Sequence, residues 1–158
     1  MDLDVLTRIA AAVAVLGTAV VYGTDMFCAI VLRPALAAVD DDVLVTVTGL
    51  THKYGDRRMP VPGMLGVLAG AACAVLAALN GRAAQASSAG IAVLLLLAWL
   101  TIYTQVSAPI NRHLTAAAIS GEHLSNGRAL QANWDRVINA RAALQGLAVA
   151  ALCVALAI

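Results

Sequence analysis

The sequence predicts an all-α integral membrane protein, a four-helix bundle whose two long connectors lie on the same side. Of its 158 residues, 61% are hydrophobic and only 12% are charged, and the mean hydropathy is +0.86. Soluble domains of this length are far more polar. Four apolar segments reach or come close to the roughly 20 residues with which a helix crosses a bilayer, and none alternates like a membrane β-barrel. The whole chain is therefore predicted to be one four-helix membrane domain.

The first predicted helix covers residues 5–32. Asp2 and Asp4 precede Arg8, the only cation before the long apolar run, which is the wrong charge for the start of a signal peptide. The apolar run is also too long for one. We therefore interpret this segment as a retained transmembrane helix.

The connector over residues 33–59 is predicted to contain a short amphipathic helix. Its three consecutive acidic residues, Asp40 to Asp42, are typical of a helix N-cap. The alternating valines that follow would also suit a strand, so the helix is favoured and the strand stays open. The second predicted helix covers residues 61–79, and the stretch "NGRAAQASSAG" predicts a turn to the third helix, residues 90–107.

The second connector is predicted to begin with a helix break at Pro109 and Ile110. The stretch "ISGEHLSNG" predicts a loop further on, after which helical spacing returns well before the fourth transmembrane segment, residues 140–158. One stripe of this helix, at i, i+4, i+7 and i+11, consists of Trp134, Ile138, Arg141 and Gln145. The fourth helix is therefore expected to start outside the membrane.

The distribution of cations predicts an orientation in the plasma membrane. Eight of the ten Lys and Arg residues lie in the two connectors or at their ends, against Arg8 and Arg82 elsewhere. By the positive-inside rule the connectors are cytoplasmic and both termini lie outside. No basic stripe or aromatic platform indicates nucleic-acid binding. Gly66 and Gly70 form a G-x-x-x-G pattern that favours close helix contact within the bundle or between protomers, so a homo-oligomer stays open.

Asp25 is the strongest indication of a functional site. A carboxylate within an apolar span costs several kcal/mol unless it is paired or faces water. It shares a helical stripe with Tyr22 and Arg33. The same end of the bundle is predicted to collect His52, Tyr103, Gln105, Ser107, Asn111, Asn139 and Arg141. Polar groups that converge from separate segments indicate a small-molecule site; alternatively, Asp25 pairs with Arg141 or Arg33 only to hold the helices together.

Metal binding is not predicted. None of the histidines stands at the spacing of a metal-binding helix. If a metal is present, His52, His113 and His123 are the candidate ligands, and copper, iron and haem chemistry stay open. The three cysteines fall in different apolar segments and are expected to be packing residues. Trp99 and Trp134 lie near the ends of apolar stretches and are more typical of membrane-interface anchors than of ligand stackers.

Three motifs together resemble the anthrone oxygenase-like family of small four-helix membrane proteins. They are "MPVPG" at the start of the second helix, "TQVSAPINRHL" at the end of the third and "NWDRVINAR" at the start of the fourth. Their most specific residues are Pro109, Asn111 and Leu114, followed by Trp134, Asn139 and Arg141. Many members of the family have a histidine near the position that Asn139 occupies in this chain. Asn139 cannot act as a base, so a mechanism that needs a base at that place is not expected here.

The resemblance implies a monooxygenase of polyketide pathways that oxidises an anthrone-type polyphenol to a quinone. Molecular oxygen is the co-substrate, with no evident metal or flavin. In such a reaction Asp25 or a nearby histidine would remove a proton, because a desolvated carboxylate is a strong base. Arg141, with Asn111 and Tyr103, would stabilise the resulting enolate. The predicted substrate contacts are Tyr22, Arg33, His52, Gln105, Trp134 and Asn139.

The main alternative is a non-catalytic membrane protein, either a partner subunit or a small-ligand binder. In that case the polar cluster would serve helix pairing. A transporter is less favoured, because the chain has no internal repeat and no pair of broken helices.

Overall fold

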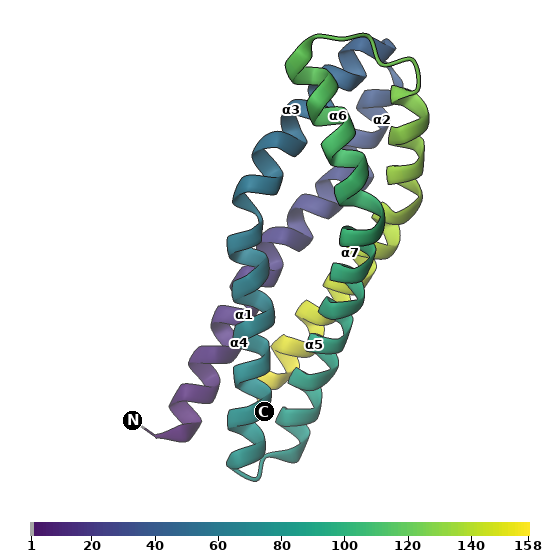
Figure 1. Cartoon of the computed structure of the whole chain (residues 1–158). Coiled ribbons are helices and arrows are strands. Elements are labelled where there is room, and N and C mark those ends of the chain that lie inside the picture. The colour runs from purple at the N-terminus through teal and green to yellow at the C-terminus, as the bar shows by residue number, and fades with distance from the viewer. Residues whose placement is uncertain (1) are drawn as a thin grey trace. The chain divides into compact units, whose positions relative to one another are not determined.

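The computed structural model describes residues 2–158, which are almost entirely helical (Figure 1). The described residues contain no strand, which confirms the all-α prediction. The elements in chain order are α1 Leu3–Phe27, η1 Cys28–Leu32, α2 Arg33–Ala37, α3 Asp41–Arg58, α4 Pro60–Leu79, α5 Ala83–Ile102, η2 Tyr103–Ser107, α6 Ala108–Ser120 and α7 Gly127–Ala157. The two η elements are π-helical turns within longer helices.

Four continuous helical segments are long and apolar enough to cross a membrane. They are Leu3–Ala37, Pro60–Leu79, Ala83–Ser120 and Gly127–Ala157. These segments fit the predicted multi-pass membrane protein. Three of them extend well beyond the predicted spans, because the predicted connectors are themselves largely helical.

The turn between α4 and α5 is much shorter than predicted. It occupies only the residues between Leu79 and Ala83, where Gly81 adopts a φ of +70° that favours glycine. The Ser-rich stretch that follows is helical. Gln85 donates from Nε2 to the Ala155 carbonyl oxygen at 2.6 Å, and Ser88 donates to that of Ala151 at 2.8 Å. These bonds give the polar side chains partners inside the helix packing.

The predicted helix break at Pro109 is absent. A proline within a helix lacks an N–H donor, and its ring collides with the carbonyl group four residues earlier. The π-helical turn η2 removes this conflict, since the Ala108 N–H binds the Tyr103 carbonyl oxygen, five residues back. The turn η1 does the same before Pro34, where Arg33 N–H binds the Cys28 oxygen. The break comes instead at Gly121, whose φ is +71°.

The stretch that begins with Asp40–Asp42 is a helix, which confirms the favoured prediction over the alternative of a strand. Asp40 caps α3, and its Oδ1 accepts a hydrogen bond from the Val43 N–H at 2.8 Å. Helix α3 lies side by side with α6 (Figure 1). Gly49 permits this close packing, because a Cβ atom there would overlap the Leu114 carbonyl oxygen and the Ala118 side chain. The Thr115 hydroxyl also donates to the Gly49 carbonyl oxygen at 3.1 Å.

The contacts divide the chain into two compact units. Unit 1 comprises Pro60–Trp99, Ala143–Ile158 and the chain up to Gly23; unit 2 comprises Thr24–Met59 and Leu100–Ala142. The prediction of a single domain stays a prediction.

Unit 1 packs mainly through small residues. Its buried clusters are Ala14, Ala92, Leu96, Ala148 and Leu152, and Ala11, Cys73, Ala89 and Ala155. A Cβ atom at Gly66 would lie 2.6 Å from Thr18 Oγ1, so the G-x-x-x-G pattern serves helix contact within this chain.

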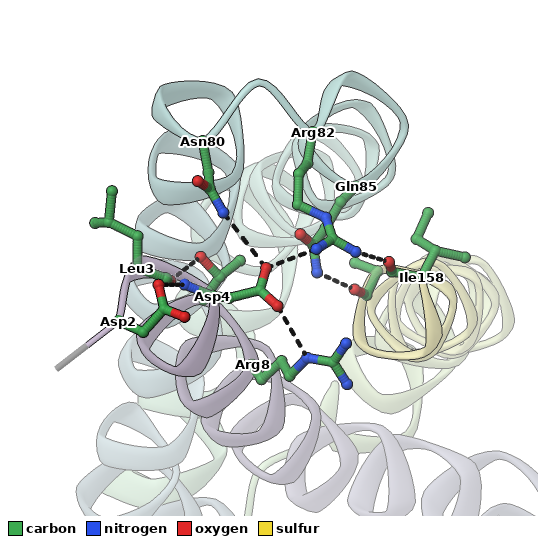
Figure 2. A network of polar contacts seen from close by, with 10 residues as sticks. Asp2, Leu3, Asp4, Arg8, Asn80, Arg82, Gln85 and Ile158 are labelled. Atoms are coloured by element: carbon green, nitrogen blue, oxygen red, sulfur yellow. Dashed lines mark hydrogen bonds and ion pairs between the residues drawn. The ribbon is translucent and has the colours of Figure 1, made fainter.

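A polar network around Asp4 connects separate segments of unit 1 (Figure 2). Arg82 lies 2.6 Å from Asp4 Oδ1 and also donates to the Ile158 carbonyl oxygen. Asn80 donates to the same Asp4 oxygen at 3.4 Å, and Arg8 lies 3.8 Å from Oδ2. The contacts of Asn80 and Arg82 join side chains that lie far apart in the sequence, whereas Arg8 and Asp4 are one helical turn apart.

Unit 2 has a core of larger side chains. Its members include Leu36, Leu44, Val45, Ile110, Leu114, Trp134 and Ile138. Unlike the core of unit 1, it also encloses a group of charged and hydrogen-bonding side chains.

Candidate functional site

The centre of unit 2 is an ion pair between Asp25 on α1 and Arg141 on α7. Arg141 Nη2 donates to Asp25 Oδ1 at 2.8 Å, and the two side chains are only 6% and 4% exposed. Nη1 of the same guanidinium donates to Ser107 Oγ, on η2, at 2.7 Å. Three helical segments therefore meet at one buried guanidinium.

A second carboxylate, Asp56 on α3, binds two other residues that were predicted for the site. Its Oδ1 accepts a hydrogen bond from the Tyr103 hydroxyl at 2.9 Å. Asn111 Nδ2 donates to both Asp56 carboxylate oxygens, at 3.0 and 3.2 Å. Asp56 was not among the predicted site residues.

Aromatic rings link the two carboxylate groups. The Arg141 guanidinium carbon lies 5.3 Å from the centre of the Trp134 ring and 5.5 Å from that of Tyr103. Both distances are typical of a cation–π contact. The His52 ring lies 5.5 Å from Trp134, with its plane tilted by 45°. We refer to this group as the unit 2 cluster; it consists of Asp25, His52, Asp56, Tyr103, Ser107, Asn111, Trp134 and Arg141.

His52 is held in its neutral form. Burial lowers the pKa of His52 from its ordinary value of 6.5 to about 4; the Asp56 carboxylate opposes this shift, and the Arg141 charge adds to it. At neutral pH the ring therefore has one nitrogen that can accept a proton. Its Nε2 atom is buried without a hydrogen-bond partner among the described residues.

Buried atoms of Asn111 and Trp134 also lack hydrogen-bond partners within residues 2–158. These are Asn111 Oδ1, which can only accept a hydrogen bond, and Trp134 Nε1, which can only donate one. Buried polar atoms are rarely left without partners, because their desolvation is then uncompensated. Such atoms in one cluster can bind either a water molecule or a polar ligand.

The structure brings together six of the predicted site residues. They are Asp25, His52, Tyr103, Asn111, Trp134 and Arg141. The prediction that Asp25 is paired is also confirmed, with Arg141 as the partner. Trp134 is only 5% exposed, so its interpretation as a membrane-interface anchor is wrong.

Four other predicted contacts lie elsewhere. Gln105 and Asn139 are exposed. Arg33 is also exposed and forms a 3.8 Å ion pair with Asp135. Tyr22 belongs to unit 1, where its ring packs against Gly146.

The helical stripe on α7 explains the position of Asn139. Ile138 and Arg141 both face the core, as the predicted stripe requires, so their neighbour Asn139 points outward. The same signal could have removed it from the predicted site.

The three histidines do not come together. His113 on α6 is exposed, and His123 lies 2.7 Å from Asp42, far along the chain from His52. Within residues 2–158, no group of three or more His, Cys, Asp or Glu side chains is arranged to hold a metal ion. The absence of a metal cofactor stays a prediction.

Taken together, the unit 2 cluster offers a proton acceptor, an anchored cation and hydrogen-bonding groups beside aromatic rings. Such a set can bind an aromatic molecule with oxygen substituents and stabilise negative charge that develops on it. Searches against protein-family models, curated proteins and solved structures find no match for this chain.

Proposed function

We propose that this protein is a membrane-embedded monooxygenase that oxidises a hydrophobic, anthrone-type polyphenol with molecular oxygen. The main support is the buried Asp25–Arg141 pair beside three buried polar atoms without partners. The motifs "TQVSAPINRHL" and "NWDRVINAR", through which the chain resembles the anthrone oxygenase-like family, contribute four residues of this cluster. They are Ser107, Asn111, Trp134 and Arg141.

Substrate binding would use the unpartnered atoms. Trp134 Nε1 would donate to a keto or phenolic oxygen, and Asn111 Oδ1 would accept from a neighbouring hydroxyl group. The rings of Tyr103 and Trp134 would contact the flat aromatic system. A ligand that satisfies both atoms must carry a donor and an acceptor, as hydroxylated anthrones do.

Proton removal is assigned to His52 rather than to Asp25. Asp25 Oδ1 is engaged by the Arg141 guanidinium at 2.8 Å, whereas His52 Nε2 has no partner among the described side chains. The low pKa of His52 keeps the ring unprotonated at neutral pH but makes it a weak base, so proton transfer from the substrate CH₂ group would depend on a nearby carboxylate that stabilises the protonated ring. Asp56 would stabilise the imidazolium ion that forms, and Asp25 would position Arg141.

The remaining steps involve the substrate and oxygen alone. Arg141 would stabilise the enolate oxygen. The enolate carbon would then form a bond to O₂, and after proton return the hydroperoxide would lose water to give a carbonyl group. One oxygen atom enters the product and the other leaves as water, so this scheme requires no further oxidant.

We place the protein in the plasma membrane, and the cation distribution supports an orientation with both long connectors in the cytoplasm. Residues of the unit 2 cluster come from both connectors or their ends. The substrate would therefore reach the site from the cytoplasm or from the lipid of the inner leaflet.

Oxygen consumption with hydroxylated anthrones tests the proposal in detergent-purified protein. Arg141→Gln should lower turnover by about 100-fold or more, as expected when a stabiliser of developing negative charge is lost. Asp25→Asn should also lower it, by mispositioning Arg141. Arg82→Gln, in unit 1, is the matched control and should retain activity. Unchanged turnover in folded Arg141→Gln and Asp25→Asn protein would remove the proposed mechanism.

A non-catalytic ligand-binding subunit is the second candidate. Arg141 connects Asp25 and Ser107 from two other helical segments, an arrangement that would also serve helix pairing alone. Co-purification of an aromatic ligand that no oxygen-dependent reaction consumes would favour this function.

A further inference from the structure

We propose that the C-terminal end of α3 is a binding site for the phosphate groups of anionic membrane lipids. The site consists of Lys53, Tyr54, Arg57 and Arg58, which we call the basic end of α3. This proposal does not depend on the proposed enzymatic function, because these residues are not part of the unit 2 cluster.

The basic end of α3 carries cations without acidic partners. Among the described residues, none of Lys53, Arg57 and Arg58 forms a salt bridge. The one carboxylate in this stretch, Asp56, is directed toward Tyr103 and Asn111. Its carboxylate is therefore engaged by hydrogen bonds, and it forms no salt bridge with the three exposed or partly exposed cations.

The opposite end of the same helix is different. There Asp41 lies 2.6 Å from Arg128, and Asp42 lies 2.7 Å from His123. The 18 residues of α3 separate the two ends by about 27 Å at 1.5 Å per residue, well beyond a Debye length of about 10 Å. The acidic end therefore does not neutralise the basic end.

Tyr54 gives the basic end an aromatic component. Its side chain is 49% exposed, with Lys53 Nζ 5.8 Å and Arg58 Cζ 5.3 Å from the ring centre. Tyrosine and cationic side chains together are typical of the headgroup level of a membrane. Arg112 on α6 is also an exposed cation, and it follows Asn111, which binds Asp56.

The position in the chain identifies the partner as a lipid surface. Only Met59 separates α3 from α4, which is a candidate membrane span starting at Pro60. Cationic clusters directly before a transmembrane helix attract anionic headgroups, each cation contributing about fivefold in affinity. The helix dipole would favour Arg57 and Arg58 in the last turn of α3, but it does not account for Lys53, Tyr54 or Arg112.

The test measures which lipids the full-length protein retains. Protein reconstituted in nanodiscs of phosphatidylcholine with about one-third phosphatidylglycerol is extracted in mild detergent, and its bound lipid is measured by native mass spectrometry. We expect phosphatidylglycerol to be enriched on the wild type. The variant Lys53→Gln/Arg57→Gln/Arg58→Gln should lose this enrichment by at least tenfold, and high salt should weaken it in the wild type.

The control is Arg136→Gln, which removes another exposed cation of unit 2 that has no salt bridge among the described residues. It should keep the enrichment, and helical circular dichroism should show that both variants are folded. Equal retention of the two lipids by wild-type protein would overturn the proposal, as would an equal loss in the control. Loss of a dimer in the triple variant without a change in bound lipid would assign the surface to a second copy instead.

Discussion

Two short Arg–Asp ion pairs, one taken from each unit, differ in burial rather than in distance. Arg82 and Asp4 lie 2.6 Å apart in unit 1, with 34% and 32% of their side chains exposed. Arg141 and Asp25 lie 2.8 Å apart in unit 2, with 6% and 4% exposed. Solvent screens the first pair, whereas the second has no water to replace a lost partner. Burial therefore decides which pair the fold depends on.

The surroundings of the two pairs extend this contrast. In unit 1, Asp4 is shared among Arg8, Asn80 and Arg82 (Figure 2), so no single contact is essential. In unit 2, a single guanidinium serves Asp25 and Ser107 and faces two aromatic rings. We interpret unit 1 as a scaffold held by small-residue packing and unit 2 as the site of function.

The largest expected effect is that of Arg141→Gln on stability. The variant leaves the Asp25 carboxylate buried without its cation, which should cost about 3–5 kcal/mol in the free energy of unfolding. Arg82→Gln in unit 1 should cost about 1 kcal/mol or less. Reversible unfolding in mixed detergent micelles measures both values.

The double variant Asp25→Asn/Arg141→Gln separates pairing from packing. It removes both charges, so it should be more stable than Arg141→Gln alone. If Arg141→Gln and Arg82→Gln were equally stable, the contrast between the two units would be lost.

Helix packing in unit 2 provides the next prediction. Gly49→Ala should cost about 3 kcal/mol, because the new methyl group overlaps the Leu114 carbonyl oxygen, a backbone atom that cannot rotate away. It should also lower activity by shifting α3, which carries His52 and Asp56. Gly66→Ala in unit 1 should cost less and spare activity, since the closest atom there is a threonine hydroxyl.

Gly55→Ala is the matched control on α3. A Cβ atom at Gly55 meets no other atom within 4 Å. The substitution should be neutral or stabilise the protein by up to about 1 kcal/mol through helix propensity. Equal destabilisation by Gly49→Ala and Gly55→Ala would show that α3 and α6 are not closely packed.

The four spans and the importance of Asp25 could be predicted from local patterns, whereas the choice of Arg141 rather than Arg33 as its partner could not. Apolar length alone indicates four spans, and helical spacing places Trp134 and Arg141 on one inward stripe of α7. Asp25 is identified by the cost of a charge in an apolar segment. These inferences need only one helix at a time.

Two features could not be predicted without information from other segments: the place of Asp56 in the site and the true ends of the predicted helix 90–107. Asp56 lies one turn after His52, so it shares a face with it only if α3 continues to Arg58, which the polar sequence did not indicate. The π-helical turn η2 keeps the helix continuous through Pro109. Because it adds one residue to a turn, it also changes the face of the helix on which the following side chains lie. Its presence depends on the accommodation of a proline, which simple helical periodicity does not describe.

The free energy of unfolding should depend on pH through unit 2 rather than unit 1. All three histidines lie in unit 2. Because the pKa of His52 falls from 6.5 to about 4 on folding, the unfolded chain takes up a proton first as the pH is lowered. The contribution of His52 to stability is therefore complete above about pH 6.5 and is progressively lost as the pH falls toward 4.

The measurement compares unfolding at several pH values in wild type and His52→Gln. The variant should lose most of the decrease between pH 6.5 and pH 4. His113→Gln, which removes an exposed histidine, should keep it. A decrease of the same size in His52→Gln would mean that another group causes it.

The smallest effect is expected for Tyr103→Phe. It removes one hydrogen bond to Asp56 and keeps both the ring that faces Arg141 and the two bonds from Asn111, so the loss should be about 1 kcal/mol. Ser88→Ala removes one bond to a backbone carbonyl in unit 1 and should cost a similar or smaller amount. Their effects on turnover should nevertheless differ. If Tyr103 contacts the substrate, Tyr103→Phe lowers turnover while Ser88→Ala does not, and equal turnover in the two variants would exclude the Tyr103 hydroxyl from the reaction.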